Sequence, residues 1–338
     1  KVFLNVNTIV DSPTMMSRRV YELLACGTPV VSTPSRAIEE QFSGIVHMAN
    51  DAQEANKIIE KLLSDDHYWD KTSHLGYREV MKKHTYAHRY QAIRKSLGYE
   101  ENLPDPLVSI VTCTRRPHMS ERLVENVARQ NHTNLELILW VQDFSPQDVE
   151  NLKSLLHGKV RNAKRIELVE DNSDKTLGQR FNAAAGLAKG DYIAKMDDDD
   201  YYFENYLSDM LIPFSFGDYA MVGKREVFMY LSGSNKLIRR FPGHRHMEFN
   251  FVAGPTFVIK KSVFDKIGFE SRNTGEDSSF LKNVIEKKYK VYAADPFNFI
   301  QYRASKGGHA WGEDDEYFIS NPQVKVEANE FDVSFVEF

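Results

Sequence analysis

The N-terminal part of the chain alternates strand-like apolar runs with stretches whose apolar residues recur at helical spacing. Residues 1–10 (KVFLNVNTIV) and 28–33 (TPVVST) have the strand-like pattern, whereas residues 17–26 (SRRVYELLAC) and 52–63 (AQEANKIIEKLL) have the helical spacing. This alternation predicts a small parallel sheet covered by helices.

The same kind of pattern returns further along the chain. Strand-like apolar runs cover residues 107–114 (LVSIVTCT), 135–143 (LELILWVQD), 165–171 (RIELVED) and 191–197 (DYIAKMD), and helix-like or loop segments separate them. Strands and helices in this order predict a second α/β region with a parallel sheet in its first half.

The segment between the two regions, residues 99–106 (YEENLPDP), is polar and contains prolines, as linkers often do. We therefore expect an α/β domain over residues 1–98, a linker over 99–106 and a second α/β domain over 107–338. Because the chain begins at Lys1 inside an expected strand, we also expect it to be a piece of a longer protein.

Polar side chains gather where the strand-like runs of the second region end. Thr114 and Asp143 end two of these runs, and an unbroken series of aspartates from Asp197 to Asp200 ends another. Ligands of open α/β sheets bind at the carboxyl ends of the strands, so we expect these side chains to meet at one rim. Adjacent carboxylates repel one another, so the aspartates must either lie open to water or hold a cation. Carboxylates at i and i+2, such as Asp197 and Asp199, suit a hard divalent ion.

Composition and charge exclude some classes of protein. A net charge of -5 gives no electrostatic case for nucleic-acid binding. The only cysteines, Cys26 and Cys113, lie far apart within apolar segments, which is typical of a reduced, cytoplasmic protein. No apolar run approaches the roughly 18 residues that span a bilayer. We therefore expect no transmembrane segment, which leaves peripheral contact with a membrane open.

Several motifs of the second region follow one another in a recognisable order. They are the opening strand at 107–114, an acidic turn at 141–145 (VQDFS), a helix, strand and aspartate run at 177–200 (LGQRFNAAAGLAKGDYIAKMDDDD), and a strand, helix and Glu-Asp pair within 252–284. In kind, order and spacing these motifs resemble the family 2 glycosyltransferases of GT-A fold, over residues 107–311. The resemblance implies a Rossmann-like domain that binds a nucleotide-diphosphate sugar.

The resemblance also implies roles for the aspartate run. Asp197 matches the aspartate that contacts the ribose of the donor, and Asp199 matches the ligand of a Mn²⁺ or Mg²⁺ ion. Asp198 is a further candidate for binding the donor, although it and Asp200 could instead only orient their neighbours or face solvent. A divalent ion at such a site offsets the charge of a diphosphate leaving group.

Three more residues match donor-binding positions of the family. Asp143 matches the acidic residue that accepts a hydrogen bond from the uracil ring, which would favour a UDP-sugar; the alternative is an aspartate that caps the turn before Ser145. Thr114 lies where the first strand ends against the base and ribose, but an ordinary strand-end threonine would look the same. Arg180 matches a helix residue that braces the nucleotide loop, and a solvent-facing arginine is the alternative.

Direct displacement of the nucleotide inverts the anomeric carbon and needs a base on the acceptor side. Asp277, in the segment NTGEDSS, matches the catalytic base of the family. The alternative is that Asp277 caps the N-terminus of the helix that follows. His309, beside a Gly-Gly pair, resembles a late histidine that completes the metal shell, and it could equally be an ordinary loop histidine.

The first region has a resemblance of its own. Residues 12–42 (SPTMMSRRVYELLACGTPVVSTPSRAIEEQF) resemble the donor-binding half of GT-B glycosyltransferases of the CgeB type. The resemblance implies that Glu22 meets a ribose and that Gly27 lets the chain turn close to a nucleotide. Only part of one Rossmann-like domain is present, so we expect this region to be catalytically incomplete and to act as a docking domain.

These observations predict an inverting, metal-dependent glycosyltransferase. The expected donor is a nucleotide-diphosphate sugar, with UDP as the nucleotide, and the expected acceptor is a hydroxyl of a glycan, glycolipid or glycoprotein. A nucleotidyltransferase would use a similar carboxylate site, but it would need a Gly-rich phosphate loop after the first strand, where TCTRRPHMSE has no glycine. A non-catalytic module that binds nucleotide sugars is the other alternative.

Overall fold

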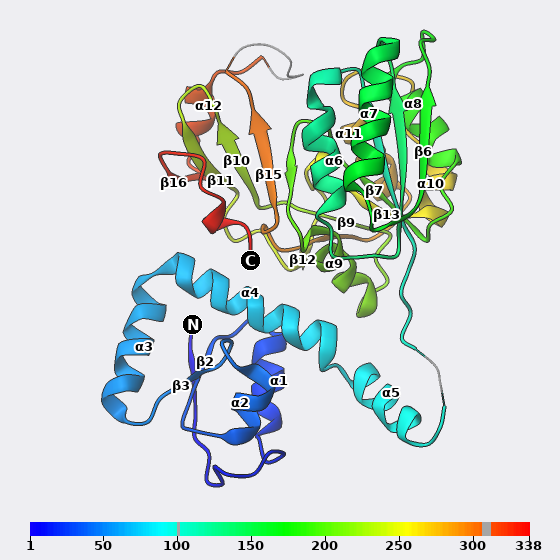
Figure 1. Ribbon diagram of the computed structural model, residues 1–338. Helices are drawn as coiled ribbons and strands as arrows, with labels where there is room; N and C mark the ends of the chain where they lie inside the picture. The colour runs from blue at the N-terminus through cyan, green and yellow to red at the C-terminus, as the bar shows by residue number, and fades with distance from the viewer. Residues whose placement is uncertain (100–101, 306–311) are drawn as a thin grey trace. The chain divides into compact units, whose positions relative to one another are not determined.

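The computed structural model describes residues 1–99, 102–305 and 312–338, and the chain divides into two compact units (Figure 1). The N-terminal unit is Lys1–Pro104 and the C-terminal unit is Asp105–Phe338, so the division falls within the segment expected to be a linker. Each unit has hydrophobic clusters of its own. No helix among the described residues is both long enough and apolar enough to cross a membrane.

The N-terminal unit is a small parallel sheet covered by helices, as the apolar pattern predicts. Val20 and Leu24 of the first helix pack against Val30 of the central strand in a buried cluster. The strands, in sheet order, are β1 (Phe3–Asn5), β2 (Val30–Ser32) and β3 (His47–Met48). The helices are α1 (Arg18–Ala25), α2 (Arg36–Phe42), α3 (Ala52–Ser64), α4 (Asp66–Lys83) and α5 (Tyr86–Ser96).

The first strand is shorter than its apolar pattern predicts. The pattern covers residues 1–10, but β1 ends at Asn5, and Val6 and Ile9 are exposed. Its parallel partner β2 is equally short, so the residues after Asn5 have no strand to pair with.

The C-terminal unit is built on an eight-stranded sheet of order β12-β14-β9-β13-β7-β4-β5-β6. The strands predicted from the apolar runs lie together as its parallel part, in the order β7-β4-β5-β6. They are β4 (Val108–Thr114), β5 (Leu135–Val141), β6 (Ala163–Glu170) and β7 (Tyr192–Lys195). The predicted α/β class is therefore confirmed for both units.

Alternating side chains of these strands bury both faces of the sheet. Ile110 and Leu137 pack in one cluster with α6 (Ser120–Ala128) and α7 (Pro146–Lys159). Val111 and Ile138, one position further along, pack in the other cluster with Phe181 of helix α8 (Leu177–Gly186). Because both faces are covered, the strands consist of almost continuous apolar runs.

The rest of the large sheet is mixed. Strand β13 (Val258–Lys260) is antiparallel to both β7 and β9 (Met221–Gly223), and β14 (Val291–Ala293) and β12 (Met247–Glu248) extend that edge. The helices of this half are α9 (Tyr206–Leu211), α10 (Lys261–Ile267) and α11 (Glu276–Glu286).

A second, five-stranded sheet has the order β16-β11-β10-β15-β8. Its first strand along the chain, β8 (Tyr201–Tyr202), begins directly after the aspartate run. The others are β10 (Val227–Leu231), β11 (Lys236–Arg240), β15 (Phe299–Arg303) and β16 (Val324–Ala328), with helix α12 (Asp315–Ile319) between the last two. The aspartate run therefore connects the carboxyl end of β7 in the large sheet to β8 at the edge of the second sheet.

Candidate active site

The aspartate run lines a cavity of about 850 Å³ in the C-terminal unit. The cavity is bordered by the carboxyl ends of β4 and β7, the start of α11, and the second sheet. Thr114, Arg180, Asp277 and the residues Asp197 to Asp200 all line it. The fold thus brings together most of the predicted site residues, which the sequence spreads over more than half of the unit.

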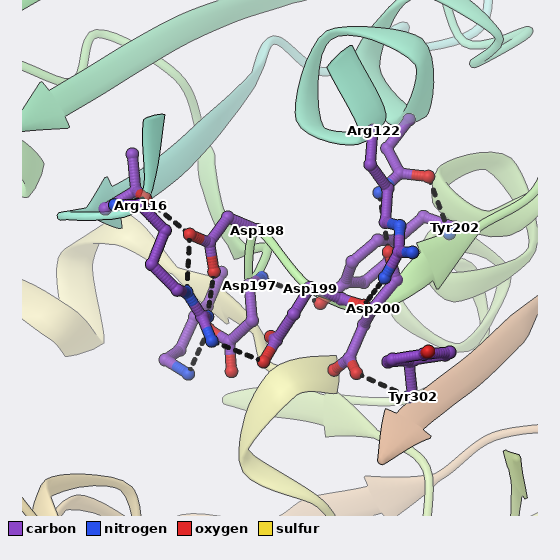
Figure 2. Close-up of polar contacts among 11 residues, drawn as sticks. Arg116, Arg122, Asp197, Asp198, Asp199, Asp200, Tyr202 and Tyr302 are labelled. Atoms are coloured by element: carbon purple, nitrogen blue, oxygen red, sulfur yellow. Dashed lines mark hydrogen bonds and ion pairs between the residues drawn. The ribbon is translucent and has the colours of Figure 1, made fainter. Parts of the chain in front are cut away.

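Asp198 is buried and held by hydrogen bonds from the end of β4 (Figure 2). The Thr114 hydroxyl donates to its carboxylate, and the Arg116 guanidinium donates to both of its oxygens, Nε at 3.0 Å from Oδ2. The same guanidinium donates through Nη1 to Oδ2 of Asp199 at 2.8 Å. The Thr114 hydroxyl is therefore paired with Asp198 in this structure, and Arg116 joins the carboxylates of Asp198 and Asp199.

Asp200 points to the other side, toward the second sheet (Figure 2). Its Oδ1 accepts a hydrogen bond from the backbone N–H of Tyr302 at 2.8 Å. Burial, together with the nearby charges of Asp199 and Asp197, raises the pKa of Asp200 well above its usual range. Burial also raises the pKa of Asp199, although Arg116 opposes the shift. Neither Asp198 nor Asp200 faces solvent, so that alternative is wrong for both.

Lys195 connects the aspartate run to the start of α11. Its Nζ lies 2.7 Å from Oδ1 of Asp197 and 3.1 Å from Oδ2 of Asp277. The lysine is buried on β7, with only 2% of its surface exposed, so its charge depends on these carboxylates. The nearby negative charges of Asp197 and Asp277 outweigh burial and raise the pKa of Lys195, which keeps it protonated.

Asp277 has a free oxygen in the cavity wall. Within the described residues its Oδ1 is buried without a hydrogen-bond partner. Burial and the nearby charge of Asp197 raise the pKa of Asp277 more than Lys195 lowers it, which brings this pKa to about 6. The N-cap of α11 is Gly275, whose φ is 74°, and Asp277 lies in the first turn beyond it. The alternative that Asp277 is the N-cap residue of this helix is therefore wrong.

Gly254 packs directly against Asp277. A Cβ atom at Gly254 would lie 2.0 Å from Oδ2 of Asp277, so no larger residue fits without displacing the carboxylate. The short 3₁₀ turn Gly254–Thr256 precedes strand β13 and thus forms part of the wall around Asp277.

The remaining predicted residues lie in different surroundings. Asp143 follows β5 in a left-handed conformation with φ of 59°, and its half-exposed carboxylate lies 3.4 Å from Nη2 of Arg115. Of the described residues, the cavity lining includes Arg115 but not Asp143. Ser145, not Asp143, caps α7. His309 lies outside the described residues.

Arg180 is buried in α8, so the solvent-facing alternative is wrong. Its Nη2 donates to the carbonyl oxygen of Ser173 at 3.2 Å, and its Nε has no hydrogen-bond partner in the described part of the chain. The arginine thus holds the loop before α8 and also lines the cavity.

In the N-terminal unit, Glu22 lies within α1 and Gly27 lies two residues beyond its end. Oε1 of Glu22 forms an exposed ion pair with Nε of Arg18 at 2.7 Å. Gly27 has a φ of 66°, a left-handed conformation that lets the chain turn from α1 toward β2. A Cβ atom there would meet Oγ of Ser73 at 2.9 Å, so Gly27 also allows close packing.

Arg116 and Lys195 are the site residues that the sequence motifs do not predict. Lys195 could have been noticed as a charge inside the apolar run that leads into the aspartates, because a lysine in a buried strand needs a carboxylate partner. Arg116 stands two residues after Thr114, at a strand end where ligands bind, but its partners are more than 80 positions away in the sequence and nothing local indicates them.

The C-terminal unit thus combines a parallel sheet with a carboxylate-lined cavity at its strand ends. Residues 108–272 match the model of the family described as glycosyl transferase family 2, and residues 1–95 match the family described as glycosyl transferase-like. These findings define the chain as a glycosyltransferase. It belongs to glycosyl transferase family 2, and the resemblances stated for both regions are confirmed.

Two curated relatives come from Escherichia coli. The putative colanic acid biosynthesis glycosyl transferase WcaA of strain K12 is 33% identical over 216 residues, which cover 59% of this chain and 74% of WcaA. The UDP-Glc:alpha-D-GlcNAc-diphosphoundecaprenol beta-1,3-glucosyltransferase WfaP is 23% identical over 194 residues, which cover 50% of this chain and 71% of WfaP.

Among solved structures, Staphylococcus aureus TarS (residues 1–349) in complex with UDP-GlcNAc superposes with a TM-score of 0.46 and 16% identity. The alignment covers 60% of this chain, and the chain likewise spans only 60% of that TarS fragment.

Proposed function

We propose that this chain transfers a sugar, with inversion, from a nucleotide-diphosphate donor to a hydroxyl of a glycan, glycolipid or glycoprotein. The observation that carries the proposal is that Asp277, with an unpartnered oxygen, shares one cavity with the aspartate run and is joined to it through Lys195. The relative WfaP is named for a UDP-glucose donor, which supports UDP as the nucleotide.

In this proposal Asp277 removes the proton from the acceptor hydroxyl. A base works best when its pKa lies slightly below the working pH, and a value of about 6 leaves Asp277 mostly ionised at neutral pH. Lys195 donates to Oδ2 and so orients the carboxylate, and Oδ1 has no hydrogen-bond partner within the described residues. The tight contact with Gly254 fixes the carboxylate against the wall.

The aspartate run fits a hard divalent cation. Its ligand atoms are carboxylate oxygens, which Mn²⁺ and Mg²⁺ prefer. Burial and mutual repulsion raise the pKa values of Asp199 and Asp200, so a nearby positive charge would relieve an unfavourable arrangement. Asp199, half-buried in the cavity lining, is the residue we assign to the ion. When bound, the ion would offset the charge of the departing nucleotide diphosphate.

The donor side is assigned to residues at the strand ends. Asp197 and Asp198 would contact the ribose and its neighbourhood, Thr114 and Arg116 hold Asp198 in place, and Arg180 braces the loop before α8. Asp143, half-exposed beside Arg115, would accept a hydrogen bond from a uracil ring.

The function is tested by screening nucleotide sugars for slow hydrolysis in the absence of acceptor. The full chain is incubated with a panel of UDP-, GDP- and dTDP-sugars and Mn²⁺, and free sugar is detected by mass spectrometry. We expect hydrolysis of a UDP-sugar, which stops when a chelator is added. Failure to hydrolyse or bind any nucleotide sugar, with or without metal, would refute the proposal.

The metal assignment predicts a coupling between UDP and Mn²⁺. Calorimetry should show that Mn²⁺ strengthens UDP binding in the wild type, because a few carboxylates alone make a weak site and the diphosphate completes it. Asp199→Ala should abolish this strengthening. Asp174→Ala, which removes an exposed aspartate of the α8 loop, is the matched control and should keep it. Equal strengthening in Asp199→Ala would exclude Asp199 as a ligand.

The raised pKa of Asp277 predicts the pH dependence of transfer. The base must be ionised to accept a proton, so kcat/KM should rise with pH and level off above about 6. The profile is measured between about pH 5 and pH 8, with circular dichroism at each pH to verify that the protein stays folded. A flat profile over this range would contradict the assignment of Asp277 as the base.

The N-terminal unit is proposed to dock rather than to catalyse. Removing residues 1–98 should leave the rate of donor hydrolysis within a few-fold of the full chain, because the two units have separate cores and every residue assigned a catalytic role lies in the C-terminal unit. The rates are compared at equal concentrations of folded protein. A loss as large as that caused by Asp199→Ala would show that the N-terminal unit takes part in the reaction.

A further inference from the structure

The second sheet contributes a basic wall to the cavity, which we define as Arg225, Arg240 and Arg303. Arg225 lies two residues before Val227 of β10, and Val227 pairs with Arg240 of β11. On its other side β10 pairs with β15, so that Met229 lies beside Gln301. Alternation along paired strands therefore puts one set of side chains on the cavity face: Arg225, Val227, Met229, Arg240, Gln301 and Arg303.

The described side chains that this sheet face contributes to the cavity include three arginines and no acidic residue. Burial lowers the pKa of Arg225. Burial, and then the charges of Arg225 and Arg303, lower the pKa of Arg240 to about 10, against an opposing effect of Tyr317. Like charges gathered in a partly buried place favour the binding of an anion.

Aromatic rings hold Arg225 in position. Its guanidinium lies 3.4 Å from the ring centroid of Phe241 and 5.0 Å from that of Phe251, and both rings line the cavity. Stacking of this kind leaves the edge of the guanidinium available for hydrogen bonds. Within the described residues its buried Nε has no hydrogen-bond partner.

The basic wall lies close to the proposed base. The backbone N–H of Ala253 donates to the carbonyl oxygen of Lys224 at 2.8 Å, which joins the residue before Arg225 to the residue before Gly254. Gly254 is the residue that packs against Asp277. This backbone hydrogen bond therefore holds the segment that contains Arg225 next to the segment that packs against Asp277, the proposed base.

We propose that the basic wall binds an anionic group, a phosphate or a carboxylate, carried by the acceptor. The inference rests on the proposed function, since it takes Asp277 to mark the acceptor side. In the proposed function the donor diphosphate is held by the divalent ion assigned to Asp199, which lies on the aspartate run and not on the second sheet. The basic wall therefore selects charged acceptors over neutral ones of the same size.

The proposal is tested with simple sugars as probes on the full chain. The protein is first saturated with UDP and Mn²⁺, so that the donor site cannot take up the probe. Methyl glucoside, glucuronate and glucose 6-phosphate are then titrated, and binding is followed by calorimetry or NMR. The variants are Arg225→Gln and Arg240→Gln, and the control is Arg161→Gln, an exposed arginine that is not part of the cavity lining.

We expect at least one anionic probe to bind about tenfold more tightly than methyl glucoside, the effect of one charge-assisted hydrogen bond. Arg225→Gln and Arg240→Gln should remove this preference, Arg161→Gln should keep it, and UDP affinity should stay the same in all three. A preference for glucose 6-phosphate identifies a phosphate group, and a preference for glucuronate identifies a carboxylate.

Equal binding of the three probes, including the absence of binding by all of them, would overturn the proposal. A fall in UDP affinity in Arg225→Gln or Arg240→Gln would also overturn it, because the arginines would then serve the donor. These failures differ from a failure of the proposed function, in which the wild type would neither bind UDP with Mn²⁺ nor hydrolyse a nucleotide sugar.

Discussion

Asp277→Asn is expected to slow sugar transfer by about 100- to 10,000-fold, the usual contribution of a general base. This corresponds to about 3 to 5 kcal/mol of activation free energy. Asparagine keeps the size of the side chain and can still accept from Lys195, but its amide cannot take the acceptor proton. The affinity for UDP should survive, because the contacts assigned to the nucleotide lie at the strand ends and not on α11.

The measurement combines the transfer rate of Asp277→Asn with its melting temperature and its UDP affinity. We expect the melting temperature to change little, because Gly275 and not Asp277 is the N-cap of α11 and the substitution removes no helix cap. A variant with normal stability, normal UDP binding and undiminished transfer would end the case for Asp277. The search would then move to Glu276, the buried neighbouring carboxylate that also lines the cavity.

The parallel half of the large sheet could be predicted because its strands are buried on both faces. Residues 107–114 are apolar except for short serine and threonine side chains, and β4 covers Val108–Thr114. Such apolar runs predict the strands directly. Because ligands bind at the carboxyl ends of the strands, Thr114 and the aspartate run are then the expected site residues. Those parts of the site follow from local pattern and topology.

The second sheet and the contacts across the cavity could not be predicted in this way. Strand β10 pairs in parallel with β15, about 70 positions later, and no local pattern indicates that register. The link between Asp197 and Asp277 likewise depends on Lys195, which reaches both carboxylates from β7. The resemblance to a family assigns a role to Asp277, but only the fold reveals that Lys195 lies between the two aspartates.

Lys195→Met is expected to affect both stability and the pH profile of transfer. The substitution keeps most of the side-chain volume over Phe181 and removes the positive charge from a buried position. Asp197 and Asp277 then lose their shared partner. Breaking a buried ion pair costs about 3 to 5 kcal/mol, and the lower end applies here because both carboxylates keep some contact with solvent.

The direction of the pH effect follows from the charges. Lys195 lowers the pKa of Asp277, whereas burial and Asp197 raise it. Without the lysine the pKa of Asp277 must rise above its value of about 6, so the acid limb of the kcat/KM profile should move to higher pH. Raising the pH should then recover part of the activity that Lys195→Met loses at neutral pH.

A role in packing alone would give a different result. Lys195→Met would then lower the melting temperature and leave the position of the acid limb unchanged, which would contradict the proposed electrostatic link. The double variant Lys195→Met/Asp277→Asn provides the matched comparison. Because the double variant also removes one of the two carboxylates that lost their lysine partner, it should be more stable than Lys195→Met alone. Unfolding measurements on the single and double variants can detect this coupling.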